Sequence, residues 1–264
     1  MKLGFIGCGN MASAIMNGII SNGLMDANEI IGADVFAPSR EKAKETLGIQ
    51  IAENNIEVVE KAEAFVLSVK PQYYQEVIGE IKDYVKDNQI VITLAPGKTL
   101  KWLEEQFGKP VKIVRTMPNT PAMVQEGMTA ACPNSYVASE EIEYVCSILK
   151  AFGEVEVVSE KLMDAVVAVS GSSPAYVFMM IEAMADAAVA EGMPRNQAYK
   201  FAAKAVMGSA KMVLETGKHP GDLKDMVCSP GGTTIEAVKV LEETGFRGAI
   251  MQAMEVCAEK SRNM

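Results

Sequence analysis

Two short segments of this chain carry residues whose types and spacing could bind and transform a small molecule. The first is the Gly-Cys-Gly-Asn-Met-Ala run at residues 7–12, which follows a strand-like apolar segment. In such a turn the first glycine permits a sharp bend, the second lets the backbone approach a pyrophosphate, and a small third residue allows close packing of helix on strand. A helix that begins here adds free N–H groups and a positive dipole end. We therefore predict a dinucleotide-binding turn made of Gly7, Cys8, Gly9, Asn10, Met11 and Ala12.

The second segment is the Cys-Ser-Pro-Gly-Gly-Thr-Thr run at residues 228–234, directly before a helical pattern at 235–243. Two glycines expose backbone N–H groups, hydroxyls flank them, and the start of a helix follows. This combination is suited to a small carboxylate and puts a threonine hydroxyl beside it. Taken alone, Thr233 or Thr234 could equally be a simple helix N-cap.

The identity of the dinucleotide depends on residues near the end of the second predicted strand. Asp34 lies where a carboxylate would bind the ribose 2′-hydroxyl of NAD. Ser39 and Arg40 follow, and a hydroxyl with a guanidinium suits the 2′-phosphate of NADP. Ser39 is also a good N-cap residue. We favour NADPH, and Asp34 leaves NADH open.

The elements that would position these residues alternate along the first half of the chain. Apolar strand-like runs alternate with amphipathic helical patterns, which is typical of parallel βαβ units. The strands are expected at 3–6, 29–33, 64–69, 90–94 and 111–115, with helices at 12–21, 40–47, 73–85 and 100–107. Two more strands, 128–131 and 155–158, flank a helix at 139–152. Because ligands bind beyond the carboxyl ends of such strands, the turns after the third and fourth strands should face the cofactor.

After about residue 160 the strand signal stops, and patterns rich in Ala, Met and Val predict helices at 175–191, 197–215, 234–243 and 247–261. The fold class predicted is α/β, with an N-terminal Rossmann-type doubly wound sheet and a C-terminal all-helical domain. We place the dinucleotide-binding domain at 1–159 and the helical substrate-binding and dimerisation domain at 160–264. The helices are apolar on more than one face, which indicates packing against another subunit.

The amino-acid composition excludes several classes of binding partner. The formal net charge is −9 and there is no tract of Lys or Arg, so nucleic acid and membrane surfaces are not expected partners. No uninterrupted apolar run approaches the roughly 20 residues that span a bilayer. The 5 cysteines are scattered, which favours free thiols in a reducing compartment and no metal site. The single histidine, His219, is expected to be structural, and the protein is expected to be cytoplasmic.

Five motifs, taken together and in order along the whole chain, resemble the pyrroline-5-carboxylate reductase family. They are residues 7–12, the Val-Lys-Pro turn at 69–71, the Met-Pro-Asn-Thr-Pro run at 117–121, the Ser-Gly-Ser-Ser-Pro-Ala-Tyr run at 170–176, and the stretch from His219 to Thr234. The resemblance implies an NAD(P)H-dependent oxidoreductase that reduces the C=N bond of 1-pyrroline-5-carboxylate to L-proline, the last step of proline biosynthesis.

The resemblance also implies roles for individual residues. Thr234 matches the threonine whose hydroxyl bonds the ring nitrogen, and it is the residue expected to be catalytic. The backbone of Ser229, Gly231, Gly232 and Thr233 matches a carboxylate cradle, and Glu160 matches a substrate-site glutamate. Contacts with the cofactor are implied for Asn55, Val69, Lys70 and Ala95. The family's helical domains interleave as homodimers, often assembled into decamers.

Two other interpretations are open at this point. The β-hydroxyacid dehydrogenases also join a Rossmann domain to a helical one, and Lys204 or Lys211 could be their catalytic lysine, but the 229–234 loop has no counterpart role there. A non-catalytic NADP-sensing or scaffold protein would bind cofactor without turnover, and it gives no reason for a carboxylate-binding loop.

Overall fold

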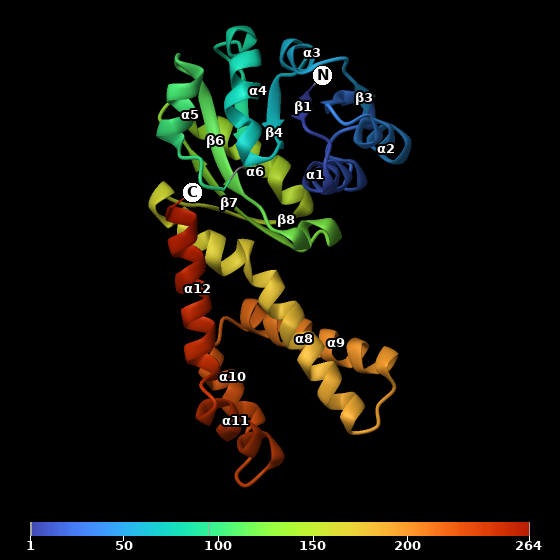
Figure 1. Cartoon of the computed structure of the whole chain (residues 1–264), viewed down its shortest axis with the longest axis vertical. Coiled ribbons are helices and arrows are strands. Elements are labelled where there is room, and N and C mark those ends of the chain that lie inside the picture. The colour runs from blue at the N-terminus through green and yellow to red at the C-terminus, as the bar shows by residue number, and fades with distance from the viewer. Residues whose placement is uncertain (1, 95, 264) are drawn as a thin grey trace. The chain divides into compact units, whose positions relative to one another are not determined.

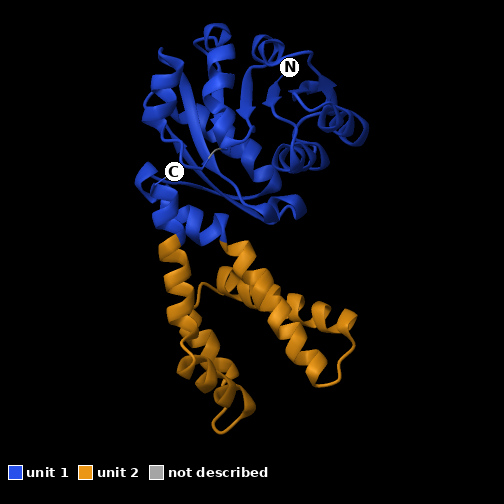
Figure 2. Ribbon diagram, in the orientation of Figure 1, with its two compact units in different colours: residues 1–172, 257–264 blue, residues 173–256 orange. Residues whose placement is uncertain are grey.

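The computed structural model describes residues 2–94 and 96–263 (Figure 1). The chain forms two compact units, Met1–Ser172 with Cys257–Met264, and Ser173–Val256 (Figure 2).

The first unit is built on an eight-stranded sheet in the order β3-β2-β1-β4-β5-β6-β7-β8. Neighbouring strands are parallel except β6 and β7, which are antiparallel. The chain order reverses between β1 and β4, which is the switch point of a doubly wound fold. The strands are β1 (Leu3–Ile6), β2 (Ile30–Ala33), β3 (Gln50–Ile51), β4 (Ala64–Leu67), β5 (Ile90–Thr93), β6 (Lys112–Met117), β7 (Gly127–Pro133) and β8 (Gly153–Val157).

Helices cover both faces of this sheet, so its central strands are buried throughout and are continuous runs of apolar residues. Successive side chains of β1 point to opposite faces: Leu3 and Phe5 pack with α1 and α6, and Ile6 packs with α3, α4 and α5. The helices are α1 (Asn10–Ser21), α2 (Ala37–Leu47), α3 (Asn55–Lys61), α4 (Tyr74–Ile81), α5 (Leu100–Phe107), α6 (Ser139–Leu149) and α7 (Met163–Val166). The predicted fold class is confirmed.

Short helical turns connect these elements. The 3₁₀ turns are η1 (Ala27–Glu29), η2 (Pro71–Tyr73), η3 (Lys82–Tyr84), η4 (Thr120–Val124), η5 (Lys150–Phe152) and η6 (Glu160–Leu162), and η7 (Val167–Gly171) is π-helical.

Two elements of the first unit were not predicted from the sequence. Strand β3 is only two residues long and offers no periodicity to read. Helix α3 is short, and it is defined by its cap: the Asn54 side chain accepts a hydrogen bond from Glu57 N at 2.9 Å. Local capping chemistry of this kind decides a short helix more than its apolar pattern does.

The second unit is helical. It contains α8 (Ser173–Ala190), α9 (Arg195–Thr216), α10 (Pro220–Val227), α11 (Thr233–Glu243) and most of α12 (Phe246–Arg262). Helix α10 was not predicted. It begins with Pro220 at its first position, and His219 caps it, because the Nδ1 atom of His219 accepts a hydrogen bond from Gly221 N at 3.0 Å. The structural role expected for His219 is therefore confirmed.

The division between the units differs from the predicted boundary at 160. Residues up to Ser172 join the first unit, and so does the end of α12. There the Ser261 hydroxyl donates to Asp164 Oδ1 at 2.7 Å, and the Cys257 thiol donates to the Ser172 hydroxyl at 3.2 Å. These contacts join segments that are far apart in the sequence, so the division between the units could not be predicted from a change in composition along the chain.

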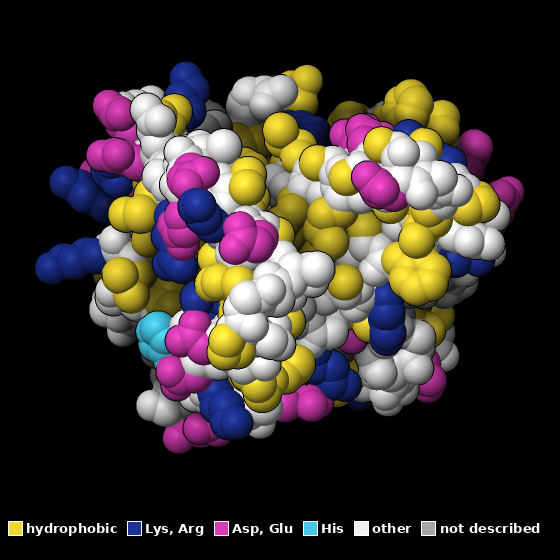
Figure 3. All heavy atoms as spheres, turned by 90° about the horizontal axis from the view of Figure 1, so that it is seen from below, with side chains coloured by type: hydrophobic (Ala, Val, Ile, Leu, Met, Phe, Trp, Pro, Cys, Tyr) yellow, Lys and Arg dark blue, Asp and Glu magenta, His cyan; other side chains and the backbone are white. Residues whose placement is uncertain are grey.

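Few side chains of the second unit are buried, and many large apolar ones are exposed (Figure 3). The most exposed include Phe178, Met179, Phe201, Leu214 and Met251, with Leu214 83% exposed. One helical stretch, Glu160–Ala190, is long and apolar enough to cross a membrane by length and composition, although charged residues such as Asp164 and Glu182 interrupt it. The core helix of a soluble protein passes the same test.

Candidate active site

The glycine turn after β1 is shaped by its first glycine. Gly7 has a φ of +100°, and a Cβ there would lie 2.9 Å from the carbonyl carbon of Ser68. Hydrogen bonds hold the turn on both sides: Gly7 N donates to Ala33 O at 2.7 Å, and the Ser68 hydroxyl donates to Gly7 O at 2.6 Å. Only glycine fits this position, for both steric and conformational reasons.

The second glycine opens helix α1. Gly9 is the N-cap residue with extended backbone, and no atom lies within 4 Å of the position a Cβ would take. Gly9 and Asn10 are exposed, whereas Ala12 is buried against the sheet. The first N–H groups of α1 therefore face open space at the carboxyl edge of β1, where a phosphate can approach them. These features fit the pyrophosphate of a dinucleotide.

The Asp34 carboxylate is turned toward the glycine turn. Its Oδ2 accepts a hydrogen bond from Cys8 N at 2.7 Å, and its Oδ1 accepts one from Phe36 N at 2.8 Å. Cys8 is buried between the two glycines, and its thiol lies 3.6 Å from Ala33 O. Burial, with a smaller contribution from the Asp34 charge, raises the pKa of the Cys8 thiol to about 12. Cys8 is therefore a neutral thiol at physiological pH.

Ser39 and Arg40 lie in the first turn of α2. The Arg40 guanidinium donates through Nη1 to the backbone carbonyl of Asp34 at 2.7 Å. This bond uses one of the five N–H donors of the side chain. Helix α2 begins at Ala37 with Phe36 as its N-cap, so the reading of Ser39 as the N-cap is wrong. The helix starts earlier than predicted because Pro38 is well tolerated in a first turn.

The other predicted cofactor residues follow strands or begin helices. Asn55 is the first residue of α3, and its side-chain amide donates to Glu80 Oε2 at 2.8 Å. Val69 and Lys70 follow β4, and Lys70 is exposed as the residue before η2. Ala95 lies outside the described residues. The structure joins Cys8 and Arg40 to Asp34 by hydrogen bonds, and within residues 2–94 and 96–263 it shows no hydrogen bond from Asn55 or Lys70 to these residues.

In the second unit, the loop before α11 depends on two glycines. Gly231 has a φ of +68°, and a Cβ on Gly232 would lie 3.2 Å from Ser229 O. Gly232 is the N-cap of α11, so neither Thr233 nor Thr234 is the cap, and that interpretation is wrong. Ser229 and Gly231 are exposed. A bend at Gly231 and the start of a helix leave N–H groups available to an anion.

Thr233 and Thr234 are the first two residues of α11, and Thr234 is half-buried. Among the residues that the structure describes, no hydrogen bond is made by the Thr234 hydroxyl. A half-buried hydroxyl that neither caps its helix nor bonds a neighbour has its hydrogen-bonding capacity left for a ligand.

Glu160 is engaged within the first unit. Its Oε1 accepts hydrogen bonds from Arg115 Nη1 at 2.7 Å and from Leu100 N at 2.7 Å. The Arg115 side chain is only 7% exposed, and Glu160 is the partner that compensates its charge. The substrate-binding role implied for Glu160 stays a prediction beside this ion pair.

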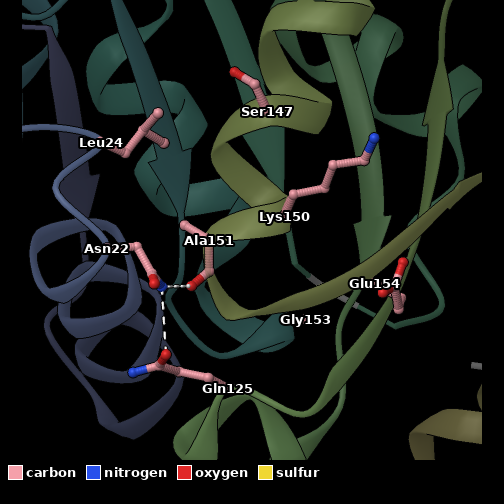
Figure 4. Close-up of a pocket in the computed structure, with 8 residues that line it drawn as sticks. All are labelled: Asn22, Leu24, Gln125, Ser147, Lys150, Ala151, Gly153 and Glu154. Atoms are coloured by element: carbon pink, nitrogen blue, oxygen red, sulfur yellow. Dashed lines mark hydrogen bonds between the residues drawn. The ribbon is translucent and has the colours of Figure 1, made fainter.

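A hollow of about 410 Å³ lies elsewhere on the first unit (Figure 4). It is lined by Asn22, Leu24, Gln125, Ser147, Lys150, Ala151, Gly153 and Glu154. The Asn22 side-chain amide donates to Ala151 O at 2.7 Å and to Gln125 Oε1 at 3.3 Å. No predicted site residue is among these lining residues.

The comparisons with known proteins agree with this geometry along the chain. Residues 160–264 match the family model for pyrroline-5-carboxylate reductase dimerisation, and residues 2–97 match that for coenzyme F420-dependent NADP oxidoreductase. The chain is 54% identical to the pyrroline-5-carboxylate reductase of Escherichia coli (strain K12), covering 100% of this chain and 98% of that protein. It is 41% identical to the one from Methanosarcina acetivorans, covering 100% and 97%.

Two solved structures are similar over nearly the whole chain. A pyrroline-5-carboxylate reductase from Coxiella burnetii superposes with a TM-score of 0.92 at 36% identity, covering 99% of this chain and 97% of that one. The Plasmodium falciparum pyrroline carboxylate reductase, solved with NADP bound, gives a TM-score of 0.91 at 33% identity, covering 100% and 97%. On full-length identity to these relatives, this chain belongs to the pyrroline-5-carboxylate reductase family.

Proposed function

We propose that this protein reduces the C=N bond of 1-pyrroline-5-carboxylate to L-proline with a hydride from NADPH. The observation that carries the proposal is membership of the family along the full chain, and it is supported by a glycine turn before α1 and a glycine-rich loop before α11. Family membership also argues against the β-hydroxyacid dehydrogenase reading built on Lys204 or Lys211.

The reaction depends more on the orientation of the imine than on a strong general acid or base. With NADPH bound, the imine carbon would accept a hydride and the ring nitrogen would take one proton from solvent, which gives a secondary amine. A hydroxyl that is hydrogen-bonded to the imine nitrogen can pass on this proton, so the residues must mainly hold the imine within about 3–3.5 Å of the hydride donor. We assign this task to the Thr234 hydroxyl at the ring nitrogen and to the backbone of Ser229, Gly231, Gly232 and Thr233 at the carboxylate.

The helical start of α11 supports the second assignment. Its first N–H groups and dipole favour an anion in front of Gly232. The Thr234 hydroxyl, close to them in the chain and without a partner among the described residues, can then donate to the nitrogen of a bound imine. A hydroxyl donor in this place stabilises the transition state without changing its own charge.

NADPH is the proposed cofactor over NADH. Both Asp34 carboxylate oxygens already accept backbone N–H groups, and Arg40 is held beside Asp34 by its carbonyl oxygen. Guanidinium donors left over after that bond suit a 2′-phosphate. Contacts of Ser39, Asn55, Val69, Lys70 and Ala95 with the cofactor remain part of the proposal.

Residues 160–264 are proposed to bind substrate and to form a homodimer that assembles further into a decamer. The exposed apolar side chains of α8 and α9, with Phe201 67% exposed, need such a cover. Light scattering after gel filtration should give a mass of ten times 28.4 kDa. A mass of two times 28.4 kDa would show that assembly stops at the dimer. A mass of 28.4 kDa would refute both.

A cytoplasmic location is proposed as well. If the Glu160–Ala190 stretch is covered by a partner subunit, the protein should stay in the supernatant after high-speed centrifugation of a detergent-free lysate. Recovery in the membrane pellet would contradict this.

The decisive assay follows the loss of reduced nicotinamide absorbance with 1-pyrroline-5-carboxylate, and identifies the product by chromatography. We expect stoichiometric L-proline and no oxidation of 3-hydroxy acids in the reverse assay. Cofactor binding without any turnover would instead support a sensing or scaffold protein.

A further inference from the structure

Two motifs, at residues 117–121 and 170–176, have no role in the function proposed above, and the structure joins them through one side chain. Asn119 follows β6 and is 8% exposed. Its Nδ2 donates to Ser170 O at 3.1 Å, and its Oδ1 accepts from Met128 N at 2.9 Å. Both ends of the amide are used, so its orientation is fixed and a carboxylate could not replace it.

The carbonyl that Asn119 binds belongs to an unusual turn. Residues Val167–Gly171 are π-helical, and Ser172 N donates to Val167 O at 2.8 Å. The Ser170 hydroxyl donates back to Val166 O at 3.1 Å. Widened turns of this kind are rare and frequently occur at functional sites.

A second contact holds the same turn against the end of β6. A Cβ on Gly171 would lie 2.9 Å from Met117 Cε, so the backbone of the turn packs directly on the last side chain of the strand. The two contacts, Asn119 with Ser170 and Met117 with Gly171, fix the turn beside the carboxyl end of β6.

The contact between Asn119 and Ser170 lies at the edge of the sheet where doubly wound folds bind their ligands. Strands β4, β5 and β6 are parallel and follow the switch point, so their carboxyl ends lie on one edge. In doubly wound folds, the first half of the sheet carries one mononucleotide half of the cofactor and the second half carries the other. The glycine turn and Asp34 belong to the half that would hold the adenosine, so the nicotinamide would lie toward β4, β5 and β6.

We propose that Asn119 is a positioning residue for hydride transfer: it holds the Val167–Gly171 turn at the nicotinamide edge of the sheet. Asn119 itself touches no reacting atom. The inference rests on the proposed function for its kinetic part, and the exchange measurement below tests its structural part separately.

The test compares Asn119→Asp with a matched variant, Asn134→Asp. Asn119→Asp keeps an acceptor for Met128 N and loses the donor to Ser170 O. Since displacements of about 1 Å can cost a hundredfold in rate, we expect kcat to fall at least tenfold while the KM for NADPH stays within about twofold. Hydrogen exchange of the Ser172 amide should become faster in the same variant.

Asn134 is a second buried side-chain amide, which follows β7 and lies beside the start of β6. Its Nδ2 donates to Glu104 Oε1 at 2.9 Å and its Oδ1 accepts from Tyr136 N at 3.3 Å. Its Oδ1 also accepts from Ile113 N at 3.1 Å, and its Nδ2 also donates to Val111 O at 2.9 Å. It is 7% exposed. Asn134→Asp should therefore lower the melting temperature while leaving kcat of the folded enzyme and Ser172 exchange unchanged.

A second variant covers the case in which Asn119→Asp fails to fold. Asn119→Ala adds no buried charge and also removes the donor to Ser170 O, and it should give the same loss of kcat at constant KM for NADPH. Wild-type kcat in folded Asn119→Asp, or an equal loss in Asn134→Asp, overturns the inference. Unchanged Ser172 exchange overturns it even if the wild-type protein has no reductase activity, an outcome that would separately refute the proposed function.

Discussion

The Asp34 carboxylate accepts a hydrogen bond from the backbone N–H of Cys8 at 2.7 Å, and this bond ties the end of β2 to the dinucleotide turn after β1. An acid at this place in a Rossmann fold is commonly interpreted as a ribose ligand that selects NAD. Here both carboxylate oxygens serve the backbone. Asp34 shapes the turn on which either cofactor depends.

Asp34→Ala should therefore weaken both cofactors alike. It removes a charge-assisted hydrogen bond worth about 1.5–3 kcal/mol, and we expect the KM values of NADPH and NADH to rise together by about tenfold. Asp34→Asn keeps a side-chain oxygen for Cys8 N and should restore most of the affinity. A rise confined to NADH in steady-state kinetics would show that Asp34 acts as a ribose ligand instead.

Arg40→Ala should separate the two cofactors. Loss of a guanidinium–phosphate contact is expected to raise the KM of NADPH by about tenfold or more and to leave that of NADH nearly unchanged. Lys42→Ala is the matched control, because it removes one positive charge from an exposed position of the same helix. Equal effects of the two substitutions would mean that only net charge matters.

The two glycines of the turn should respond differently to alanine. Gly7→Ala places a Cβ against the Ser68 backbone at positive φ, so both the melting temperature and NADPH binding should fall. Gly9→Ala meets no protein atom, so it should fold normally and lose NADPH affinity only. Gly79→Ala, on an exposed face of α4, controls for the glycine change and should stabilise the helix by about 0.5–1 kcal/mol. Normal NADPH binding by Gly9→Ala, measured by calorimetry, would argue against a pyrophosphate at this turn.

Thr234→Ala should lower kcat by about ten- to a hundredfold with cofactor binding intact, since it removes a donor to the developing charge. Thr234→Ser should recover most of the rate. Thr244→Ala is the matched control: this exposed threonine ends α11, and its hydroxyl donates to Val240 O at 2.9 Å. Wild-type turnover by Thr234→Ala would refute the role.

The Cys8 thiol should resist alkylation in the folded protein. Its pKa of about 12 lies above the ordinary value of 9.0, so it stays protonated at neutral pH. Because the folded pKa is the higher one, its contribution to stability is complete below pH 9.0 and is lost as the pH rises toward about 12. Mass spectrometry after iodoacetamide treatment at neutral pH should find Cys8 unmodified and the partly exposed Cys228 modified. Rapid native labelling of Cys8 would contradict its burial.

The amino-acid sequence by itself determined the features that depend on neighbours along the chain. The apolar runs of β1, β4 and β5 predicted buried parallel strands, and the spacing of Gly7, Gly9 and Ala12 predicted the turn and the helix after it. Periodicity and turn chemistry act within a few residues, so one chain suffices to read them. Short elements such as β3 and α3 were missed because they are too brief to show a period.

Tertiary structure alone decided where the polar side chains point. Asp34 and Arg40 looked like competing cofactor ligands in the sequence, and only folding shows the carboxylate bonded to Cys8 N and the guanidinium bonded to Asp34 O. Glu160 is hydrogen-bonded to Arg115, and Asn119 to Ser170, and the partners in each pair are far apart in the sequence. A buried polar group must bond whichever partner the packed strands and helices bring to it, and no local pattern in the sequence records that partner.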